Sequence, residues 1–325
     1  MISPRIVVTR RPPGIALDQL GSAGDVWLWP EDRAIDRELL LDQVASAVGL
    51  YSMLTERIDA ELLNSASRLK VVSNMAVGVD NVDLAACTER GIPVGHTPDV
   101  LTETTADTAF GLLLMAARRL VEGVDYVRRD LWGEWDPNLL WGSDVHGSTL
   151  GIIGLGRIGR AIARRAGGFG MRVFYSSRSR HLDAEETLGI EYVHLEGLLA
   201  VADHVIVATS LTRDTYHLID AAALDVMKAS ATLINISRGK TVDSGALYVA
   251  LRDGVIAAAG LDVTDPEPLR ADHPLVGLPN CVIVPHLGSS SRSTRESMAL
   301  LAVNNLIAGL AGERLAACAN PEVYD

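Results

Sequence analysis

The chain has 325 residues, of which 48% are hydrophobic and 22% are charged, so it is long enough for two compact domains and too apolar for intrinsic disorder. Its 29 basic and 41 acidic side chains give a net charge of −12, which argues against nucleic acid or an anionic membrane surface as a partner. No apolar run approaches the ~20 residues of a membrane-spanning helix, and residues 1–10 have no signal-peptide pattern, so we expect a cytoplasmic protein. The three cysteines have neither disulfide nor metal-ligand spacing, and we expect no metal site and buried thiols at Cys87, Cys281 and Cys318.

The first part of the chain alternates short apolar runs with helical segments. Strands are predicted at residues 5–9, 26–29, 48–54, 69–75 and 92–94, with helices at 37–45, 60–67 and 82–90. A long helix is predicted over residues 103–129, followed by an arm that contains Trp132, Trp135 and Trp141. The alternation predicts a parallel sheet flanked by helices.

A second alternation of strands and helices begins after the arm. Its strands are predicted at residues 150–154, 172–175, 204–208, 232–237, 257–263 and 282–285. The final helix, at residues 295–311, follows the last of these strands, and we expect it to return to the first domain. We therefore predict two α/β domains, one made of residues 1–99 and 294–325 and the other of residues 100–293.

A glycine-rich turn opens the second domain. The GxGxxG pattern follows an apolar strand directly and precedes a helical run. Gly154 permits a tight turn, Gly156 lets the backbone approach a pyrophosphate, and Gly159 allows the helix to pack closely. The pattern predicts a dinucleotide site formed by Gly154, Leu155, Gly156, Arg157, Ile158 and Gly159.

The end of the next strand indicates which dinucleotide binds. An NAD site usually has an acidic residue there, which binds the ribose 2′-hydroxyl, but Tyr175 is followed by Ser-Ser-Arg-Ser-Arg. Two arginines with hydroxyls between them suit a 2′-phosphate, so NADPH is the predicted cofactor and NADH a weaker alternative. The residues concerned are Ser177, Arg178, Ser179 and Arg180, and the competing interpretation is that both arginines are solvated surface charges.

Three later strands each end close to a residue that handles charge: Arg238, Asp262 and His286. The carboxyl ends of parallel strands meet at one edge of a sheet, where ligands bind. Glu267, which has a proline on each side, is expected at the same edge. An arginine stabilises negative charge on a carbonyl oxygen, and an imidazole beside a carboxylate is a suitable proton donor. The set predicts reduction of a carbonyl group next to a carboxylate.

Six segments carry a family resemblance: LKVVSNMAVGVDNVD, GIPVGHTPDVLTETTAD, GIIGLGRIGRAIARR, INISRGKTVD, GVIAAAGLDVTDPEPL and NCVIVPHLGSSS. From about residue 69 onward the chain resembles the D-isomer-specific 2-hydroxyacid dehydrogenases, most closely the glyoxylate/hydroxypyruvate reductases. The resemblance implies two Rossmann-like or flavodoxin-like domains, the first binding substrate and the second binding the dinucleotide. It also implies that a small 2-keto acid, glyoxylate or hydroxypyruvate, is reduced to glycolate or D-glycerate.

The resemblance also implies individual roles. Arg238 would hold the substrate and polarise its carbonyl, His286 would donate the proton, and Glu267 would be its carboxylate partner. Asp262 would bind the nicotinamide carboxamide. The substrate carboxylate would be cradled by the backbone of Ala76, Val77 and Gly78, and further cofactor contacts would come from Thr105, Ser210, Ile236 and Gly288.

The arm departs from the pattern of these reductases. Two positions after the Trp-x-Pro of their arm, they have an aromatic residue that reaches into the active site of a partner subunit, whereas this chain has Leu139 there and Trp141 two positions further on. Either residue is a candidate for that role. Three clustered tryptophans favour a homodimer, with a small substrate pocket lined by Met53, Val77 and the partner's Leu139 or Trp141.

Two other functions remain as alternatives. One is an NAD-dependent D-2-hydroxyacid dehydrogenase for a bulkier acid, which the lack of an acidic residue after Tyr175 disfavours. The other is a nucleotide-sensing binding protein that acts in transcriptional co-repression and performs no catalysis, although no peptide-binding groove is evident from the sequence.

Overall fold

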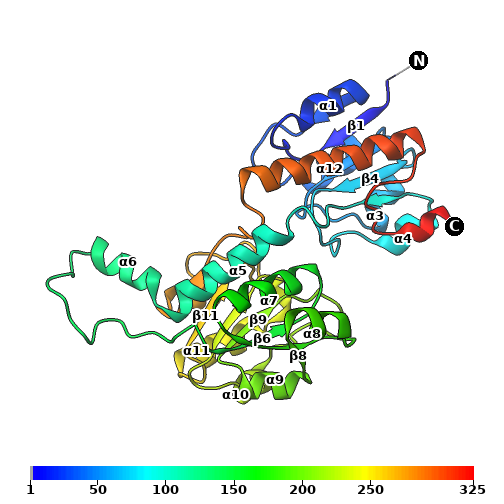
Figure 1. The fold of residues 1–325 in the computed structure, drawn as a ribbon. Coiled ribbons are helices and arrows are strands. Elements are labelled where there is room, and N and C mark those ends of the chain that lie inside the picture. The colour runs from blue at the N-terminus through cyan, green and yellow to red at the C-terminus, as the bar shows by residue number, and fades with distance from the viewer. Residues whose placement is uncertain (1–2) are drawn as a thin grey trace. The chain divides into compact units, whose positions relative to one another are not determined.

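The computed structural model describes residues 3–325 (Figure 1). The chain forms two compact units, which are described separately below. Unit 1 consists of Met1–Leu101 and Ser290–Asp325, and unit 2 of Thr102–Ser289. Within residues 3–325, no helix is both long enough and apolar enough to cross a membrane.

Unit 1 is built on a five-stranded parallel sheet with the strand order β2-β1-β3-β4-β5. The central strands β3 and β4 are buried along their whole length, as expected where helices cover a parallel sheet on both faces. The strands are β1 (Arg5–Val8), β2 (Asp25–Leu28), β3 (Gly49–Ser52), β4 (Val71–Asn74) and β5 (Val94–Gly95). The helices are α1 (Ala16–Ala23), α2 (Arg37–Val44), α3 (Ala60–Ser65), α4 (Leu84–Glu89), α12 (Arg292–Ala311) and the short 3-10 helix Pro321–Tyr324.

The last long helix, α12, lies across the sheet of unit 1 beside α1 (Figure 1). The Ser73 hydroxyl of β4 donates to the carbonyl of Ala302 at 2.7 Å. Helix and strand approach so closely that a Cβ at Gly309 would lie 2.5 Å from a methyl carbon of Val71. The prediction that the final helix returns to the first domain is confirmed. It begins at Arg292, before the predicted start, because the Ser291 hydroxyl caps its first turn.

Unit 2 contains a seven-stranded parallel sheet in the order β12-β11-β10-β9-β6-β7-β8. The strands are β6 (Thr149–Ile153), β7 (Arg172–Ser176), β8 (Glu191–Tyr192), β9 (His204–Val207), β10 (Thr232–Asn235), β11 (Ala258–Leu261) and β12 (Cys281–Ile283). The helices are α5 (Thr102–Ala117), α6 (Leu120–Arg128), α7 (Arg157–Gly168), α8 (Leu182–Leu188), α9 (Leu195–Val201), α10 (Ala221–Val226) and α11 (Ser244–Arg252), with 3-10 turns at Gly239–Thr241 and Pro274–Gly277. The chain leaves β6 toward β7 in one direction and returns to β9 on the other side, so the strand order reverses between β6 and β9. The predicted class, two parallel sheets flanked by helices, is confirmed.

The prediction of one helix over residues 103–129 is wrong. Helix α5 ends at Ala117 and α6 begins at Leu120, with Arg119 in the left-handed region at a φ of 53°. The amide of Ser143 donates to the Ala117 carbonyl at 2.8 Å, so the returning arm takes the acceptor that a continuing helix would use. A tertiary contact therefore ends α5.

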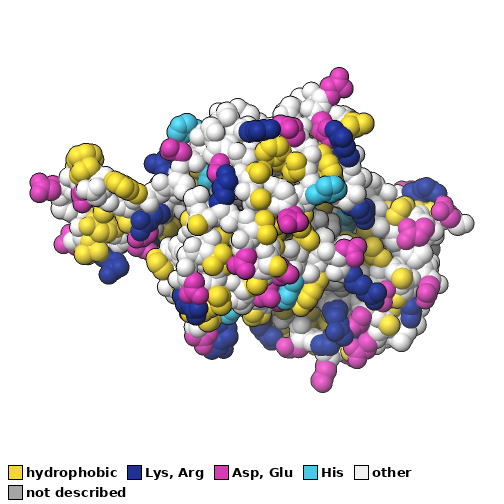
Figure 2. All heavy atoms as spheres, turned by 90° about the horizontal axis from the view of Figure 1, so that it is seen from below, with side chains coloured by type: hydrophobic (Ala, Val, Ile, Leu, Met, Phe, Trp, Pro, Cys, Tyr) yellow, Lys and Arg dark blue, Asp and Glu magenta, His cyan; other side chains and the backbone are white. Residues whose placement is uncertain are grey.

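Helix α6, which follows the break, and the arm both expose apolar side chains. In Figure 2 the lobe at the left, formed by α6 and the arm, carries many yellow side chains. We call this set the arm face: Leu120, Val121, Val124, Val127, Leu131, Trp132, Trp135 and Trp141, each more than a third exposed. Nothing within residues 3–325 buries any residue of α6.

The cysteines differ in burial. Cys87 is buried in the core of unit 1, whereas Cys281 and Cys318 are partly exposed. The expectation of buried thiols is therefore right for Cys87 and wrong for the other two, which lie at β12 and at the C-terminal segment.

Candidate active site

Three neighbouring strands of unit 2 deliver side chains to one edge of the sheet. Asp262 follows β11 directly, Arg238 lies three residues after β10, and His286 lies three residues after β12. Because the strands are parallel neighbours, their carboxyl ends share this edge. We call it the rim of unit 2.

His286 and Glu267 form a hydrogen-bonded pair at the rim. The imidazole Nδ1 lies 2.6 Å from Glu267 Oε1, and both side chains are partly exposed. Burial raises the pKa of the Glu267 carboxyl, but the hydrogen bond and charge of His286, together with the Arg238 charge, outweigh it and hold that pKa below its ordinary value. The carboxylate therefore stays ionised and accepts from Nδ1, which leaves the imidazole Nε2 as the reactive nitrogen.

Asp262 fixes the backbone turn that carries His286. His286 has a left-handed φ of 54°, and its amide donates to the Asp262 carbonyl at 2.9 Å. The Asp262 carboxylate, 2% exposed, accepts from the amides of Leu287 at 2.6 Å and Gly288 at 2.9 Å. Burial raises the pKa of this carboxyl, and the two amides act against that rise. Asp262 thus positions His286, while its contact with a nicotinamide carboxamide stays a prediction.

Arg238 is held by a turn that the sequence reasoning missed. Asn235, the last residue of β10, donates from Nδ2 to the Arg238 carbonyl at 2.9 Å and accepts from the amide and hydroxyl of Ser237. A Cβ at Gly239 would lie 1.9 Å from the Thr264 carbonyl oxygen, so the turn packs directly on the segment that leads to Glu267. The signal in the sequence that could have identified this turn was Asn235, a polar residue at the end of an apolar strand.

The glycine turn fits a dinucleotide. Gly154 has a φ of 96°, and a Cβ there would meet the Ala208 carbonyl at 2.8 Å. At Gly159 a Cβ would lie 2.2 Å from the Gly154 oxygen, so helix and turn are in contact. At Gly156, the N-cap of α7, a Cβ would meet nothing within 4 Å. That open side of the turn is where a pyrophosphate could reach the helix N-terminus.

The two arginines of the loop after β7 differ in their contacts. Arg178 is exposed and has no hydrogen-bond or ion-pair partner in the described part of the chain. Arg180, by contrast, binds both carboxylate oxygens of Glu185, with Nη2 at 2.7 Å from Oε2 and Nε at 2.8 Å from Oε1. Ser177 donates to the Ser179 carbonyl at 2.6 Å, which closes the loop between them. Glu185 is a residue that the sequence reasoning missed.

The remaining predicted cofactor contacts lie at or near the rim. Thr105 is buried beside Gly288, and its neighbour Thr108 donates to the Gly288 carbonyl at 3.4 Å. Ser210 is exposed after β9, and Ile236 is nearly buried after β10. Leu155 is 2% exposed and packs in the core, so its side chain lies away from solvent. Arg157 is exposed and Ile158 partly buried at the start of α7.

In unit 1, three consecutive carbonyls of the loop after β4 are hydrogen-bonded. The Ala76 carbonyl accepts from Thr97 N at 2.8 Å, the Val77 carbonyl lies 3.0 Å from His96 Nδ1, and the Gly78 carbonyl accepts from Asn74 Nδ2 at 3.3 Å. The amides of Val77 and Gly78 make no hydrogen bond to any other described residue. The loop thus has two amide donors without an acceptor among the described residues, and their binding of a carboxylate stays a prediction.

Asn81 ties this loop to the loop that carries Met53. Its Nδ2 donates to the carbonyls of Met53 at 3.0 Å and Glu56 at 2.8 Å, while its Oδ1 accepts from Asn74 at 3.1 Å. The buried Glu56 carboxylate accepts from the Met53 amide at 2.8 Å. Sequence reasoning missed these polar residues, although Asn74, which is buried at the end of β4, marked the place.

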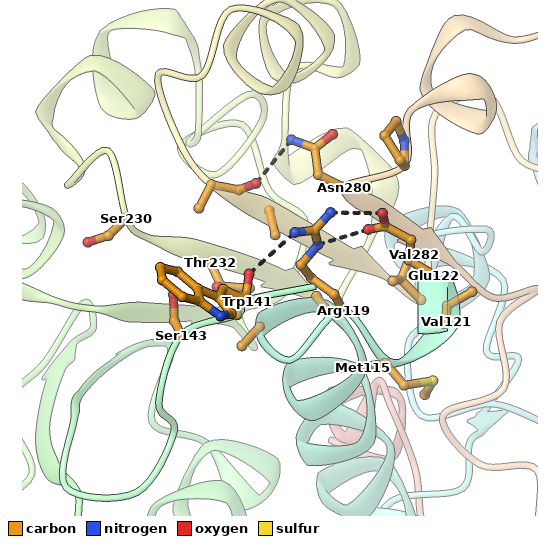
Figure 3. Close-up of a pocket in the computed structure, with 16 residues that line it drawn as sticks. Met115, Arg119, Val121, Glu122, Trp141, Ser143, Ser230, Thr232, Asn280 and Val282 are labelled. Atoms are coloured by element: carbon orange, nitrogen blue, oxygen red, sulfur yellow. Dashed lines mark hydrogen bonds and ion pairs between the residues drawn. The ribbon is translucent and has the colours of Figure 1, made fainter. Parts of the chain in front are cut away.

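A separate pocket of about 380 Å³ lies at the opposite, amino-terminal edge of the unit 2 sheet. Thr232 and Val282, near the starts of β10 and β12, line it, and the base of the arm closes it. Figure 3 shows Arg119 between the Glu122 carboxylate and the carbonyl of Trp141. The pocket is remote from the rim along the strands, so it is not part of the candidate active site. Among residues 3–325, no group of three or more metal-binding side chains is placed to hold an ion.

Comparisons with known proteins agree with this geometry. Residues 110–288 match the family model "D-isomer specific 2-hydroxyacid dehydrogenase, NAD binding domain". A glyoxylate reductase of Thermococcus gammatolerans is 48% identical over 99% of this chain and 97% of its own length. The structure of the TT0316 protein of Thermus thermophilus has a TM-score of 0.91 and 49% identity, covering 97% of this chain and 99% of the other.

A further structure is that of an NADPH-dependent glyoxylate/hydroxypyruvate reductase from Sinorhizobium meliloti in complex with NADP and malonate. It has a TM-score of 0.85 and 34% identity, and the match covers 98% of each chain. The rim, the glycine turn and these matches together identify the chain as a member of the D-isomer-specific 2-hydroxyacid dehydrogenases and an NAD(P)-dependent oxidoreductase.

Proposed function

We propose that the protein is an NADPH-preferring reductase that converts glyoxylate and hydroxypyruvate to glycolate and D-glycerate. The observation that carries the proposal is the His286–Glu267 pair at 2.6 Å on the same rim as Arg238. The similarity to the glyoxylate reductase of Thermococcus gammatolerans and the glyoxylate/hydroxypyruvate reductase of Sinorhizobium meliloti supports the same substrates.

The chemistry divides between the residues of the rim. A bound nicotinamide cofactor supplies the hydride, which goes to the 2-keto carbon. Arg238 stabilises the negative charge that develops on the carbonyl oxygen, and His286 transfers a proton from Nε2 to that oxygen. Glu267 accepts from Nδ1 and so orients the imidazole, with Nε2 directed to the substrate oxygen. Hydride and proton together convert the keto group to a hydroxyl group.

The two units have different roles in this proposal. Unit 1, predicted as residues 1–99 and 294–325, binds the substrate carboxylate through the amides of Val77 and Gly78, with Ala76 and Met53 in the same loops. Unit 2, predicted as residues 100–293, binds the dinucleotide. The two amides are uncharged donors to the substrate carboxylate, and in this proposal Arg238 provides the positive charge.

The preference for NADPH rests on the loop after β7. It has no acidic residue at the strand end, and Arg178 extends into solvent with both serines beside it. The 2′-phosphate carries nearly two negative charges, so a charge-assisted hydrogen bond from Arg178 favours NADPH. NADH is expected to serve as the weaker cofactor.

The arm face supports the proposed homodimer. It exposes eight large apolar side chains, and a second copy would bury them. Trp141 lines the pocket at the base of its own arm, and its Nε1 donates to the Pro137 carbonyl at 2.7 Å. Leu139, which is partly buried, and Trp141, which is 70% exposed, therefore both remain candidates for the residue that reaches a partner subunit and limits substrate size.

The decisive assay follows oxidation of NADPH and NADH by purified protein with glyoxylate, hydroxypyruvate, pyruvate and phenylpyruvate. We expect the highest kcat/KM with NADPH and one of the first two acids. Replacement of His286 by alanine should lower kcat by roughly 100 to 10,000-fold, as for the loss of a general acid. A higher kcat/KM for phenylpyruvate would refute the small-acid assignment. Cofactor binding with no turnover of any acid would favour the binding-protein alternative.

A further inference from the structure

Arg180 belongs to a closed network at the end of β7. Its guanidinium binds both oxygens of Glu185, and the Tyr175 hydroxyl donates to Glu185 Oε1 at 2.8 Å. The same hydroxyl accepts from the amide of His181 at 2.7 Å. Glu185 therefore has three donors on its two oxygens, and its side chain is only 15% exposed. A bidentate pair with a third hydrogen bond has one well-defined geometry.

The ends of the loop are anchored independently of this network. The Gly154 amide donates to the Ser176 carbonyl at 2.8 Å, which joins the loop to the glycine turn. On the other side, Arg160 of α7 binds Asp183 at 2.6 Å, next to the start of α8. The backbone of residues 177–180 is thus held near the turn by contacts that do not require Glu185.

The charge balance of the loop follows from these contacts. Both arginines are positive, but Glu185 cancels the charge of Arg180 at contact distance. Arg180 lowers the pKa of the Glu185 carboxyl, so this negative charge persists at neutral pH. The net attraction for a 2′-phosphate is therefore close to that of Arg178 alone.

We propose that Glu185 is a specificity-determining residue that limits the preference of this site for NADPH over NADH by holding Arg180 in an ion pair. The inference rests on the proposed binding of the 2′-phosphate by the loop after β7. It assigns opposite effects to two residues of this region: Arg178 strengthens the binding of NADPH, and Glu185 weakens it.

Replacement of Glu185 by glutamine separates charge from shape. The glutamine side chain would keep an oxygen that accepts from the Tyr175 hydroxyl, but it carries no charge. Arg180 is then available to a phosphate, and a repulsive carboxylate is removed. Both changes favour NADPH, while the neutral 2′-hydroxyl of NADH responds to neither. We expect KM for NADPH to fall about threefold to tenfold, a range reduced for solvent screening because Arg180 is 59% exposed.

The experiment measures kcat and KM for both cofactors, with glyoxylate saturating, in the wild type and in Glu185→Gln. KM for NADH and both kcat values should stay within about twofold of wild type. The matched control is Glu186→Gln, which removes the same charge from an exposed position one residue further along α8. It should leave the NADPH/NADH ratio of kcat/KM unchanged. In the Arg180→Ala background, Glu185→Gln should give a smaller gain, because only the removal of the repulsive carboxylate remains and no arginine is released.

Other outcomes overturn the inference. If Glu185→Gln raises KM for NADPH, or changes both cofactors equally with a lower Tm, Glu185 is a structural brace. If the control gains as much as Glu185→Gln, the effect is long-range charge. Arg178→Ala separates the two proposals: if it raises KM for NADPH while Glu185→Gln has no effect, only the role of Glu185 is refuted. If Arg178→Ala also leaves KM for NADPH unchanged, the proposed cofactor preference itself fails.

Discussion

His286 shows how a strained residue is stabilised by a buried neighbour. A left-handed backbone costs a residue with a side chain roughly 1 to 2 kcal/mol. Asp262 offsets that cost, because its carbonyl and carboxylate accept three successive amides, from His286, Leu287 and Gly288. The imidazole is thereby aimed by main-chain geometry on one side and by Glu267 on the other.

His96 is expected to position the amide donors of unit 1. Its Nδ1 must carry the hydrogen to bond the Val77 carbonyl, since a carbonyl only accepts. His96→Asn places an amide nitrogen where Nδ1 lies, so KM for glyoxylate should change little. His96→Leu removes the donor and should raise KM about fivefold, with a smaller change in kcat. Steady-state kinetics and the Ki of oxamate test this pair. Equal effects of both variants would contradict the role.

Glu267 gives a pH-dependent contribution to stability. Its folded-state pKa lies below the ordinary value of 4.5, so ionisation favours the folded state. That contribution is complete well above pH 4.5 and is lost as the pH falls through the folded-state pKa. As the pH falls below about 4.5, the difference in Tm between wild type and Glu267→Gln should therefore shift against the wild type. Thermal unfolding above and below that pH tests it, and a difference independent of pH would contradict the pairing with His286.

At the scale of elements, two glycines of the turn before α7 have separable functions. Gly159→Ala forces a Cβ to within 2.2 Å of the Gly154 oxygen and should destabilise the apoprotein by about 1 to 3 kcal/mol. Gly156→Ala meets no protein atom within 4 Å, so the Tm of the apoprotein should stay nearly unchanged. Its methyl group lies on the side open to a pyrophosphate, and Kd for NADPH should rise at least about tenfold. Cofactor fluorescence titration would contradict this if Gly156→Ala bound NADPH normally.

The sequence predicts the site best where a strand ends near a glycine or a charged or titratable side chain. Periodicity and glycine spacing predict the two parallel sheets, and the order of strand ends predicts that Arg238 and His286 share an edge. The break between α5 and α6 is not predictable, because it depends on Ser143, which is distant in sequence and takes the Ala117 carbonyl. Helical propensity alone continues through Arg119.

Side chains that support others were harder to predict than those expected to react. Asn235, His96 and Glu185 act through hydrogen bonds whose partners become neighbours only in the folded chain. From the sequence, Glu185 is one more acidic residue on an exposed helix. Its pairing with Arg180 depends on the loop turning back toward α8, which no local pattern encodes.

At the scale of the whole molecule, the arm face predicts self-association. We expect sedimentation velocity to show a dimer at micromolar concentration. Val124→Asp with Val127→Asp places two charges on α6, at side chains that are 48% and 54% exposed, and should shift the protein to monomer with its fold intact. Ile15→Asp is the control, because Ile15 is also exposed but lies outside the arm face. A monomeric wild type, or dissociation caused equally by the control, would exclude the arm face as the interface.

The return of the chain to unit 1 has a consequence for biosynthesis. The strands of unit 1 are made before unit 2, whereas α12 and the residues that bind the segment of β5 are made after it: Asn320 binds the Val94 amide at 2.8 Å, and Asn305 binds the His96 carbonyl at 3.0 Å. Unit 2 lies wholly between these parts and can fold as a unit while translation continues. The face of β3 and β4 that α12 covers therefore stays open until α12 has been synthesised. A nascent chain halted before α12 would carry a finished dinucleotide unit and an aggregation-prone open sheet.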